Sequence, residues 1–194
     1  MITQIGVLAL QGAFASHVAC IAELGHSPVE VRNTADLNNL DALIMPGGES
    51  STMSQLLASS VLFEPIKDVI ADGLPIFGTC AGMILLSHEI VDGKLDQCCF
   101  DAIDITVRRN AFGRQVDSFE ANVDTVIGDF HGVFIRAPRI EAVGEKVQVL
   151  GTYGGEPVLV CQANVLAASF HPELAGDVRL HEYFINSFVT TKEK

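Results

Sequence analysis

The sequence predicts an α/β fold: a single domain, residues 1–194, in which a mixed but largely parallel, doubly wound sheet is flanked by helices. Its first half alternates short apolar runs with segments of helical periodicity, the order that β-α-β units produce. The runs at 2–10 and 74–77 are apolar without strict alternation, which is typical of parallel strands covered on both faces. A chain of 194 residues is long enough to bury one sizeable core, and no linker divides it.

The elements of the first half follow from these patterns. A helix is expected from after Gly12 to about Leu24, because apolar residues recur on one face of it. The segment PGGESS at 46–51 is expected to be a loop, followed by helical patterns to about Asp72. The strands expected here are 2–10, 27–31, 41–45 and 74–77, and a helix is expected over 81–90.

The second half changes character and predicts a succession of strands before a terminal helix. TYGGEP at 152–157 has the glycines of a hairpin turn. The final helix is expected from about Val178 to Thr190. The strands expected in this half are 103–109, 117–124, 132–137, 146–153, 156–164 and 165–170.

The composition excludes several classes of function. A net charge of −12 argues against a nucleic-acid surface and against binding to anionic membranes. No apolar stretch reaches the roughly 18 residues that cross a bilayer, and no signal peptide is recognisable, so we expect a soluble, cytoplasmic protein. The five cysteines are odd in number and lack the spacing of zinc sites, which favours a reducing compartment. They are Cys20, Cys80, Cys98, Cys99 and Cys161.

The pentapeptide GTCAG at 78–82 predicts a tight strand-to-helix turn that presents Cys80. Small residues flank such a turn because the backbone passes very close to the nucleophile. Cys80 would then lie at the N-terminus of a helix, where the dipole and the free N–H groups favour the thiolate. The N–H of Ala81 would point toward an oxyanion. The alternative is that Cys80 is a small hydrophobic residue buried for packing.

A thiol nucleophile needs a base, and His171 is the strongest candidate. It follows an apolar strand in the tripeptide His171-Pro172-Glu173, where proline stiffens the turn. Glu173 could hold one ring nitrogen while the other faces Cys80. The alternative is a strand-end histidine capped by a nearby acid. Of the other histidines, His181 is expected to be a surface or interhelical residue, and no partner pattern is seen for His17, His26, His88 or His131.

The loop after the strand at 41–45 is the third candidate. Ligands of open α/β sheets bind beyond the carboxyl ends of the strands, and Gly47-Gly48 could bring N–H groups close to a substrate there. Arg109 and Arg136 could bind a substrate carboxylate, or could be surface ion-pair partners. The surface role is preferred for Arg108, Arg114 and Arg139.

Together these motifs resemble the class I, triad-type glutamine amidotransferases, a flavodoxin-like group. Within that class the chain is similar to the family of glutaminase subunits of pyridoxal 5′-phosphate synthases. RNAFGRQ-x-x-SFE and FIRAP narrow the resemblance to this family. The matching stretches are 6–12, 46–51, 77–82, 109–120, 132–138 and 169–174.

The resemblance implies a site and a reaction. Cys80 would be the nucleophile, His171 the base and Glu173 its orienting group, with the N–H groups of Gly48 and Ala81 as the oxyanion hole. Glutamine would be hydrolysed to glutamate and ammonia. A synthase subunit would use the ammonia, with ribose 5-phosphate and glyceraldehyde 3-phosphate, to make pyridoxal 5′-phosphate, and its docking would place the oxyanion donors. No cofactor or metal is expected in this chain. The residues implied to hold glutamine are Gly48, Glu49, Ser50, Arg109, Ile135 and Arg136.

Three alternatives remain at this point. The chain could be a glutaminase that serves another synthase, such as one for histidine or aminodeoxychorismate. It could be a hydrolase or chaperone with a cysteine elbow, although many of those place histidine directly after the cysteine, where this chain has Ala81. It could also be a catalytically silent binding subunit.

Overall fold

The computed structural model describes residues 2–94, 96–109 and 118–190 and contains one large sheet and one small one. The nine-stranded sheet has the order β2-β1-β3-β4-β12-β11-β10-β7-β8 and the small sheet the order β5-β6-β9. Pairing is parallel from β2 to β12 and antiparallel from β12 to β8. The strands of the large sheet are β1 (Gln4–Leu8), β2 (Ser27–Val31), β3 (Ala42–Met45), β4 (Ile76–Thr79), β7 (Ser118–Thr125), β8 (Phe130–Ile135), β10 (Gln148–Tyr153), β11 (Glu156–Gln162) and β12 (Val165–Ala168).

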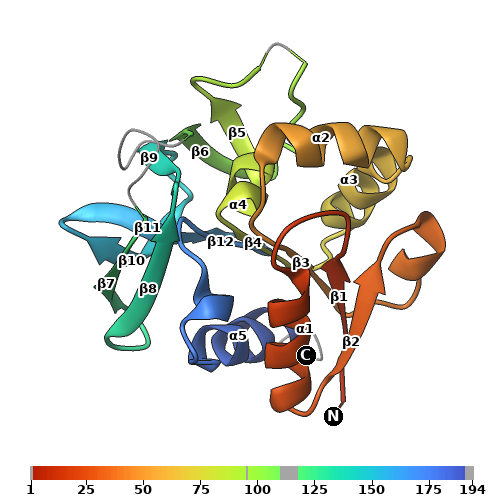
Figure 1. The fold of residues 1–194 in the computed structure, drawn as a ribbon, viewed down its shortest axis with the longest axis horizontal. Coiled ribbons are helices and arrows are strands. Elements are labelled where there is room, and N and C mark those ends of the chain that lie inside the picture. The colour runs from red at the N-terminus through yellow and green to blue at the C-terminus, as the bar shows by residue number, and fades with distance from the viewer. Residues whose placement is uncertain (1, 95, 110–117, 191–194) are drawn as a thin grey trace.

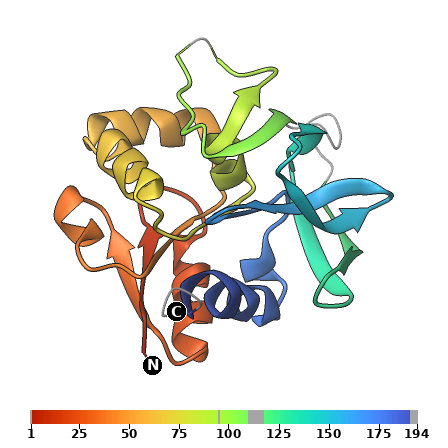
Figure 2. The same cartoon turned by 180° about the vertical axis from the view of Figure 1, so that it is seen from behind.

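Helices cover both faces of the parallel half of the sheet. In Figure 1, α2 (Ser50–Ser59), α3 (Phe63–Ala71) and α4 (Ala81–Leu86) lie above it, and α1 (Phe14–Glu23) and α5 (Arg179–Phe184) lie below it. Figure 2 shows the same two layers from behind. The small sheet lies on the upper side, and its strands are β5 (Ser87–Ile90), β6 (Ile103–Arg108) and β9 (Arg139–Val143). The doubly wound α/β architecture predicted from the sequence is therefore confirmed.

The core consists of two clusters that share strands of the large sheet. The upper cluster lies between the sheet and α2, α3 and α4, and the lower cluster lies between the sheet and α1 and α5. Along β3, Leu43 and Met45 belong to the upper cluster, and Ala42 and Ile44 belong to the lower one. Successive side chains of a strand point to opposite faces, so a strand that is covered on both faces must be apolar throughout. All four residues of β3 are fully buried, which explains the continuous apolar pattern.

Most predicted elements are confirmed within one or two residues, and two regions need correction. The helix expected over 81–90 is wrong in its second half, because α4 ends at Leu86 and 87–90 form strand β5 beside β6. Strand β9 was not predicted. The expected hairpin turn at 152–157 is confirmed, with Gly154 and Gly155 at positive φ between β10 and β11.

The terminal helix has the expected extent but not uniform geometry. After α5 the chain continues in a π-helical turn, η3 (Ile185–Val189). Short 3₁₀ turns, which were not predicted, are η1 (Thr34–Leu37) and η2 (Pro172–Leu174).

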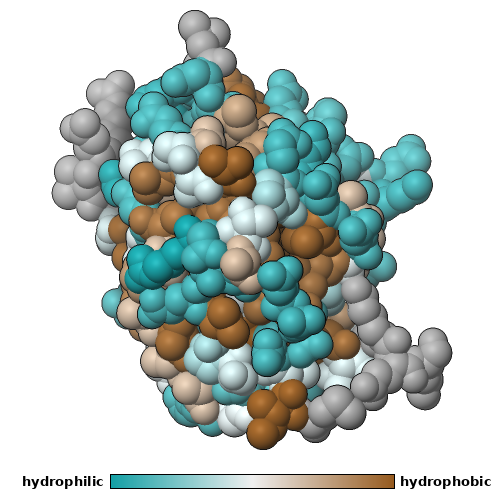
Figure 3. All heavy atoms as spheres, turned by 90° about the vertical axis from the view of Figure 1, so that its right-hand side faces the viewer, coloured by the Kyte–Doolittle hydropathy of each residue, from teal (hydrophilic) through white to brown (hydrophobic). Residues whose placement is uncertain are grey.

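Figure 3 shows the face of the molecule that lies on the right in Figure 1. Hydrophobic and hydrophilic residues are interspersed on this face. Within the described residues, none of the helices has the length and apolar character that crossing a membrane requires.

The topology brings three strand ends together. β4 is flanked by β3 and β12, all three parallel, with Met45 in register with Gly78 and Ala168 in register with Thr79. The segments that follow these strands therefore emerge side by side at one edge of the sheet. They are the Pro46–Glu49 loop, Cys80, and the segment that leads to His171.

Candidate active site

Cys80 lies at a strained turn between β4 and α4. Its backbone has φ +50° and ψ −104°, a conformation that costs a non-glycine residue about 1–3 kcal/mol. The turn is fixed from outside, since the Cys80 N–H donates to the Ala168 carbonyl at 2.8 Å. Gly82 is required by close packing, because a Cβ there would lie 2.1 Å from the carbonyl oxygen of Met45. The strand-to-helix elbow predicted from GTCAG is thus present.

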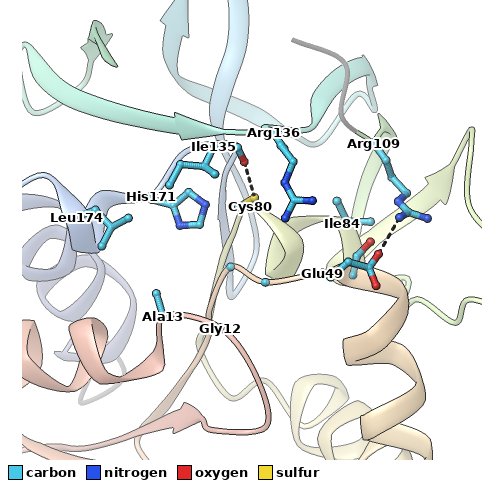
Figure 4. Close-up of a pocket in the computed structure, with 13 residues that line it drawn as sticks. Gly12, Ala13, Glu49, Cys80, Ile84, Arg109, Ile135, Arg136, His171 and Leu174 are labelled. Atoms are coloured by element: carbon cyan, nitrogen blue, oxygen red, sulfur yellow. Dashed lines mark hydrogen bonds and ion pairs between the residues drawn. The ribbon is translucent and has the colours of Figure 1, made fainter. Parts of the chain in front are cut away.

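The thiol opens into a cavity of about 290 Å³ (Figure 4). All six residues that the sequence implied for substrate binding line this cavity, together with Cys80 and His171. Sequence reasoning missed four further lining residues, which are Gly12, Ala13, Ile84 and Leu174.

His171 and Glu173 form a buried pair beside the thiol. His171 Nδ1 lies 2.8 Å from Glu173 Oε1, and both residues are less than a tenth exposed. The His171 N–H donates to the Val133 carbonyl at 2.8 Å, which anchors the turn to β8, and Pro172 begins the 3₁₀ turn η2. Burial lowers the pKa of His171, but hydrogen bonding and charge from Cys80 and Glu173 outweigh it and raise that pKa to about 10. The imidazole is therefore protonated at neutral pH and ready to donate a proton.

The loop after β3 approaches the imidazole directly. A Cβ on Gly47 would lie 2.2 Å from His171 Cε1, so only glycine permits this distance between loop and ring. The loop is also tied to the segment after β1. A Cβ on Gly12 would lie 1.7 Å from the Gly47 carbonyl oxygen, and the Glu49 N–H donates to Gln11 Oε1 at 3.2 Å.

Glu49 and Arg109 form an ion pair at one side of the cavity. Glu49 caps α2, its carboxylate accepting from the N–H and hydroxyl groups of Ser51 and Thr52. Burial raises the pKa of Glu49, but these hydrogen bonds, with Thr52 first, lower it to about 2. Arg109 Nη2 donates to Glu49 Oε1 at 2.9 Å, and Nη1 donates to Gln97 Oε1 at 3.0 Å. The Glu49 carboxylate and the Arg109 guanidinium therefore both have hydrogen-bond partners within the protein.

Ile135, the last residue of β8, and Arg136, which follows it, also line the cavity. The Cys80 thiol points to the Ile135 carbonyl, with Sγ and O 3.8 Å apart (Figure 4). Arg136 has φ +45°, and its side chain extends over the cavity. Within the described part of the chain, no carboxylate lies at ion-pair distance from the Arg136 guanidinium.

The remaining predictions concern arginines expected on the surface and the two residues expected to form the oxyanion hole. Arg108 and Arg139 form exposed ion pairs with Glu141 and Glu156, as expected, whereas Arg114 lies outside the described residues. Most of the stretch RNAFGRQ, residues 110–115, also lies outside them. Gly48 lines the cavity, but Ala81, which is 1 % exposed, does not.

Comparison with known proteins agrees with this geometry. Residues 7–190 match the model of the SNO glutamine amidotransferase family. The chain belongs to that family. Among its relatives is pyridoxal 5′-phosphate synthase subunit PdxT of Corynebacterium jeikeium, 54 % identical over 93 % of this chain and 94 % of the relative. The protein of the same name from Frankia casuarinae is 50 % identical over 95 % and 94 %.

Solved structures extend the family's fold to more distant proteins. A crystal structure of a glutamine amidotransferase, 48 % identical, superimposes with a TM-score of 0.89 over 94 % of this chain and 97 % of that one. A chain in the structure of PurLQS from Thermotoga maritima is 15 % identical and has a TM-score of 0.71, over 96 % and 99 % of the two chains. This more distant likeness shows a shared fold only.

Two histidines that sequence reasoning set aside lie directly behind Glu173. His17 and His181 are both 0 % exposed, and His181 lies between α1 and α5, which confirms the interhelical one of its two expected positions. His17, for which the sequence shows no partner pattern, has partners in the fold: its Nε2 lies 3.4 Å from Glu173 Oε2, and its Nδ1 lies 2.9 Å from His181 Nε2. The only sequence signal was a histidine on the buried face of a helix, which does not reveal a partner more than 150 positions away.

Metal ligation has no candidate group in the described ranges. No cluster of three or more His, Cys, Asp or Glu side chains there could hold an ion.

Proposed function

We propose that this chain is the glutaminase subunit of a pyridoxal 5′-phosphate synthase. It hydrolyses L-glutamine to L-glutamate and ammonia. The ammonia passes to a synthase subunit that builds pyridoxal 5′-phosphate from ribose 5-phosphate and glyceraldehyde 3-phosphate. The observation that carries the proposal is the Cys80–His171–Glu173 constellation, which lies at the edge of a cavity in a chain of the glutamine amidotransferase family. The name of the relatives at 50–54 % identity supports the choice of synthase.

Cys80 is the nucleophile in this proposal. Its thiolate attacks the side-chain amide carbon of glutamine, and the C–N bond then breaks as the nitrogen takes a proton from His171 and leaves as ammonia. Water attacks the resulting γ-glutamyl thioester and gives its proton to His171. The C–S bond breaks, which releases glutamate and restores the thiolate. Glu173 orients the imidazole throughout.

The oxyanion that forms on the amide carbon needs N–H donors. We assign this role to the backbone N–H groups of Gly48 and Ala81, because Gly48 lines the cavity and Ala81 follows Cys80 as the first residue of α4. The first N–H groups of a helix have no partner within the helix. One such donor is typically worth about 3 kcal/mol of the activation barrier.

The polar end of glutamine requires a cation for its α-carboxylate. Arg136 suits this role better than Arg109, because Glu49 already neutralises Arg109 at 2.9 Å. Arg109 and Glu49 instead form a wall of the cavity, with Ser50 and Ile135 as further contacts.

The domain assignment and the compartment are part of the proposal. We take residues 1–194 as one glutaminase domain, supported by two core clusters that share the strands of one sheet. We place the reaction in the cytoplasm, which the free state of all five cysteines supports.

The proposal is tested by measuring ammonia release from glutamine by the wild type and by Cys80→Ala, each with and without the synthase subunit. We expect release that requires Cys80 and rises when the synthase is present. Release that requires Cys80 but ignores this synthase would point to a different synthase. No Cys80-dependent release under either condition would contradict the enzymatic function.

A further inference from the structure

We propose that His17 and His181 are positioning residues that extend the triad into the core, with His17 donating its Nε2–H to the second carboxylate oxygen of Glu173. His181 in turn fixes the tautomer of His17 by donating Nε2–H to His17 Nδ1. The inference rests on the proposed function in assigning a catalytic consequence to this arrangement.

Four buried side chains lie in a continuous row, in the order His171, Glu173, His17 and His181. Glu173 Oε1 accepts from His171 Nδ1 at 2.8 Å, whereas Oε2 has no hydrogen-bond partner among the described residues. His17 Nε2 lies 3.4 Å from this oxygen. His17 Nε2 also lies 3.3 Å from Thr79 Oγ1, so one N–H can be shared between the hydroxyl and the carboxylate. The Glu173 side chain is 0 % exposed, so bulk water does not solvate this oxygen.

The charge state of the two histidines supports an N–H donor rather than a second ion. Burial, followed by the charges of His181 and His171, holds the pKa of His17 well below its ordinary value. Burial alone lowers the pKa of His181 to about 4. Both rings are therefore neutral at neutral pH, and each carries one ring proton.

Two tautomer arrangements satisfy the 2.9 Å contact between the rings, and the surroundings decide between them. If His17 Nδ1–H donated to His181 Nε2, the lone pair of His17 Nε2 would face the oxygen of Glu173. His181 Nδ1, which has no partner among the described residues, would then be a buried N–H donor without an acceptor. The opposite arrangement directs an N–H at the carboxylate and leaves only a lone pair unpartnered at His181 Nδ1. Orphaned buried N–H groups are the rarer of the two cases.

The consequence is a carboxylate held at both oxygens. One oxygen accepts from His171 and the other faces His17, so rotation of Glu173 away from the imidazole loses two contacts rather than one. His17 and His181 do not line the cavity, so they act on the reaction through Glu173 and not on substrate binding.

The kinetic test compares His17→Gln with His17→Met in the complex with the synthase subunit. Glutamine keeps a donor near the position of Nε2, and methionine has a similar volume without a donor. For His17→Met we expect kcat for glutamine hydrolysis to fall about 10- to 100-fold, by analogy with the loss seen when the hydrogen-bond partner that orients a metal-binding side chain is removed. We expect KM to change little and His17→Gln to recover most of kcat. Equal kcat values for the two folded variants, or a loss confined to KM, would overturn the proposal.

The second test does not depend on activity or on any variant folding. Long-range ¹H–¹⁵N correlation spectra of the wild-type chain report which ring nitrogen carries the proton. We expect protonated Nε2 and bare Nδ1 for both His17 and His181. A protonated Nδ1 on His17 would overturn the proposal even if the enzyme is a glutaminase. Conversely, an inactive wild type with the expected tautomers would contradict the proposed function and leave the hydrogen-bond assignment in place.

Discussion

At the scale of single residues, Cys80 and Glu173 determine the protonation state of the His171 imidazole. Its pKa rises to about 10, against the effect of burial, through the contacts with Cys80 and Glu173. A raised histidine pKa means that the charged form is favoured in the folded chain, so the proton is present below pH 10 and is lost above it. At neutral pH the imidazole can therefore protonate departing ammonia without first acquiring a proton from solvent.

Removing one neighbour tests this account. In Cys80→Ala we expect the pKa of His171 to fall by about 1 to 3, the usual effect of losing a nearby opposite charge. An NMR titration of the His171 ring measures it. Cys20→Ala is the matched control, because burial raises the pKa of Cys20 to about 11 and keeps it a neutral thiol. An unchanged pKa of His171 in Cys80→Ala would show that the thiol does not influence the imidazole.

The glycine that touches the imidazole provides a second test. Gly47→Ala places a methyl group 2.2 Å from His171 Cε1, so the ring or the loop must shift. We expect glutaminase activity to fall at least about 100-fold, since a displacement of about 1 Å at a reacting group can cost that much. Urea unfolding should show a loss of about 1–3 kcal/mol from overpacking.

Gly25→Ala is its control. Gly25 has φ +79° with open space around it, and it is not among the residues that line the cavity. We expect this variant to lose stability by about 1 kcal/mol through backbone strain alone and to keep its activity. Equal activity of the Gly25→Ala and Gly47→Ala variants would mean that the contact with His171 is unimportant.

At the scale of elements, the helix α2 depends on the carboxylate of Glu49 at its N-terminus. The pKa of Glu49 is lowered to about 2, so its contribution is complete above the ordinary value of 4.5 and is lost as the pH falls toward 2. We expect Glu49→Gln to be less stable than the wild type by about 1 kcal/mol at pH 7, the usual worth of a cap, and partial exposure limits the effect. The difference should shrink below pH 4.5. Urea unfolding at several pH values measures it.

Glu30→Gln serves as the control for that series. Glu30 pairs with Arg32 on the exposed surface and caps no helix. Its substitution should change stability by less than about 0.5 kcal/mol, since exposed ion pairs contribute little. A pH-independent difference for Glu49→Gln would contradict the cap.

The sequence predicts best those elements whose residue pattern lies within one short segment of the chain. The buried strand β3 and the elbow at Cys80 each follow from a short run of residues. The strand β5 does not, because its first three residues, Ser87, His88 and Glu89, are polar and its pairing partner β6 begins 16 positions after β5 does. The His17–Glu173 contact was missed for the same reason: it joins two segments whose proximity only the folded topology creates.

At the scale of the whole molecule, the two core clusters are expected to unfold together. They lie on opposite faces but share β1, β3, β4 and β12, so losing either one exposes the same strands. This arrangement predicts that residues 1–194 behave as one cooperative unit. A protein with two independent domains would instead lose one cluster before the other.

Substitutions on the two faces test this prediction. Leu57 lies in the upper cluster and Ile21 in the lower one, both 0 % exposed, and truncation of either to alanine should cost about 2–5 kcal/mol. We expect each variant to unfold in a single transition, with far-UV circular dichroism and tyrosine fluorescence giving the same midpoint. The two tyrosines, Tyr153 on β10 and Tyr183 on α5, report on separate elements, and the chain contains no tryptophan. If Leu57→Ala split the transition while Ile21→Ala did not, the upper layer would be a separate folding unit. The active site at the shared edge would then join two domains.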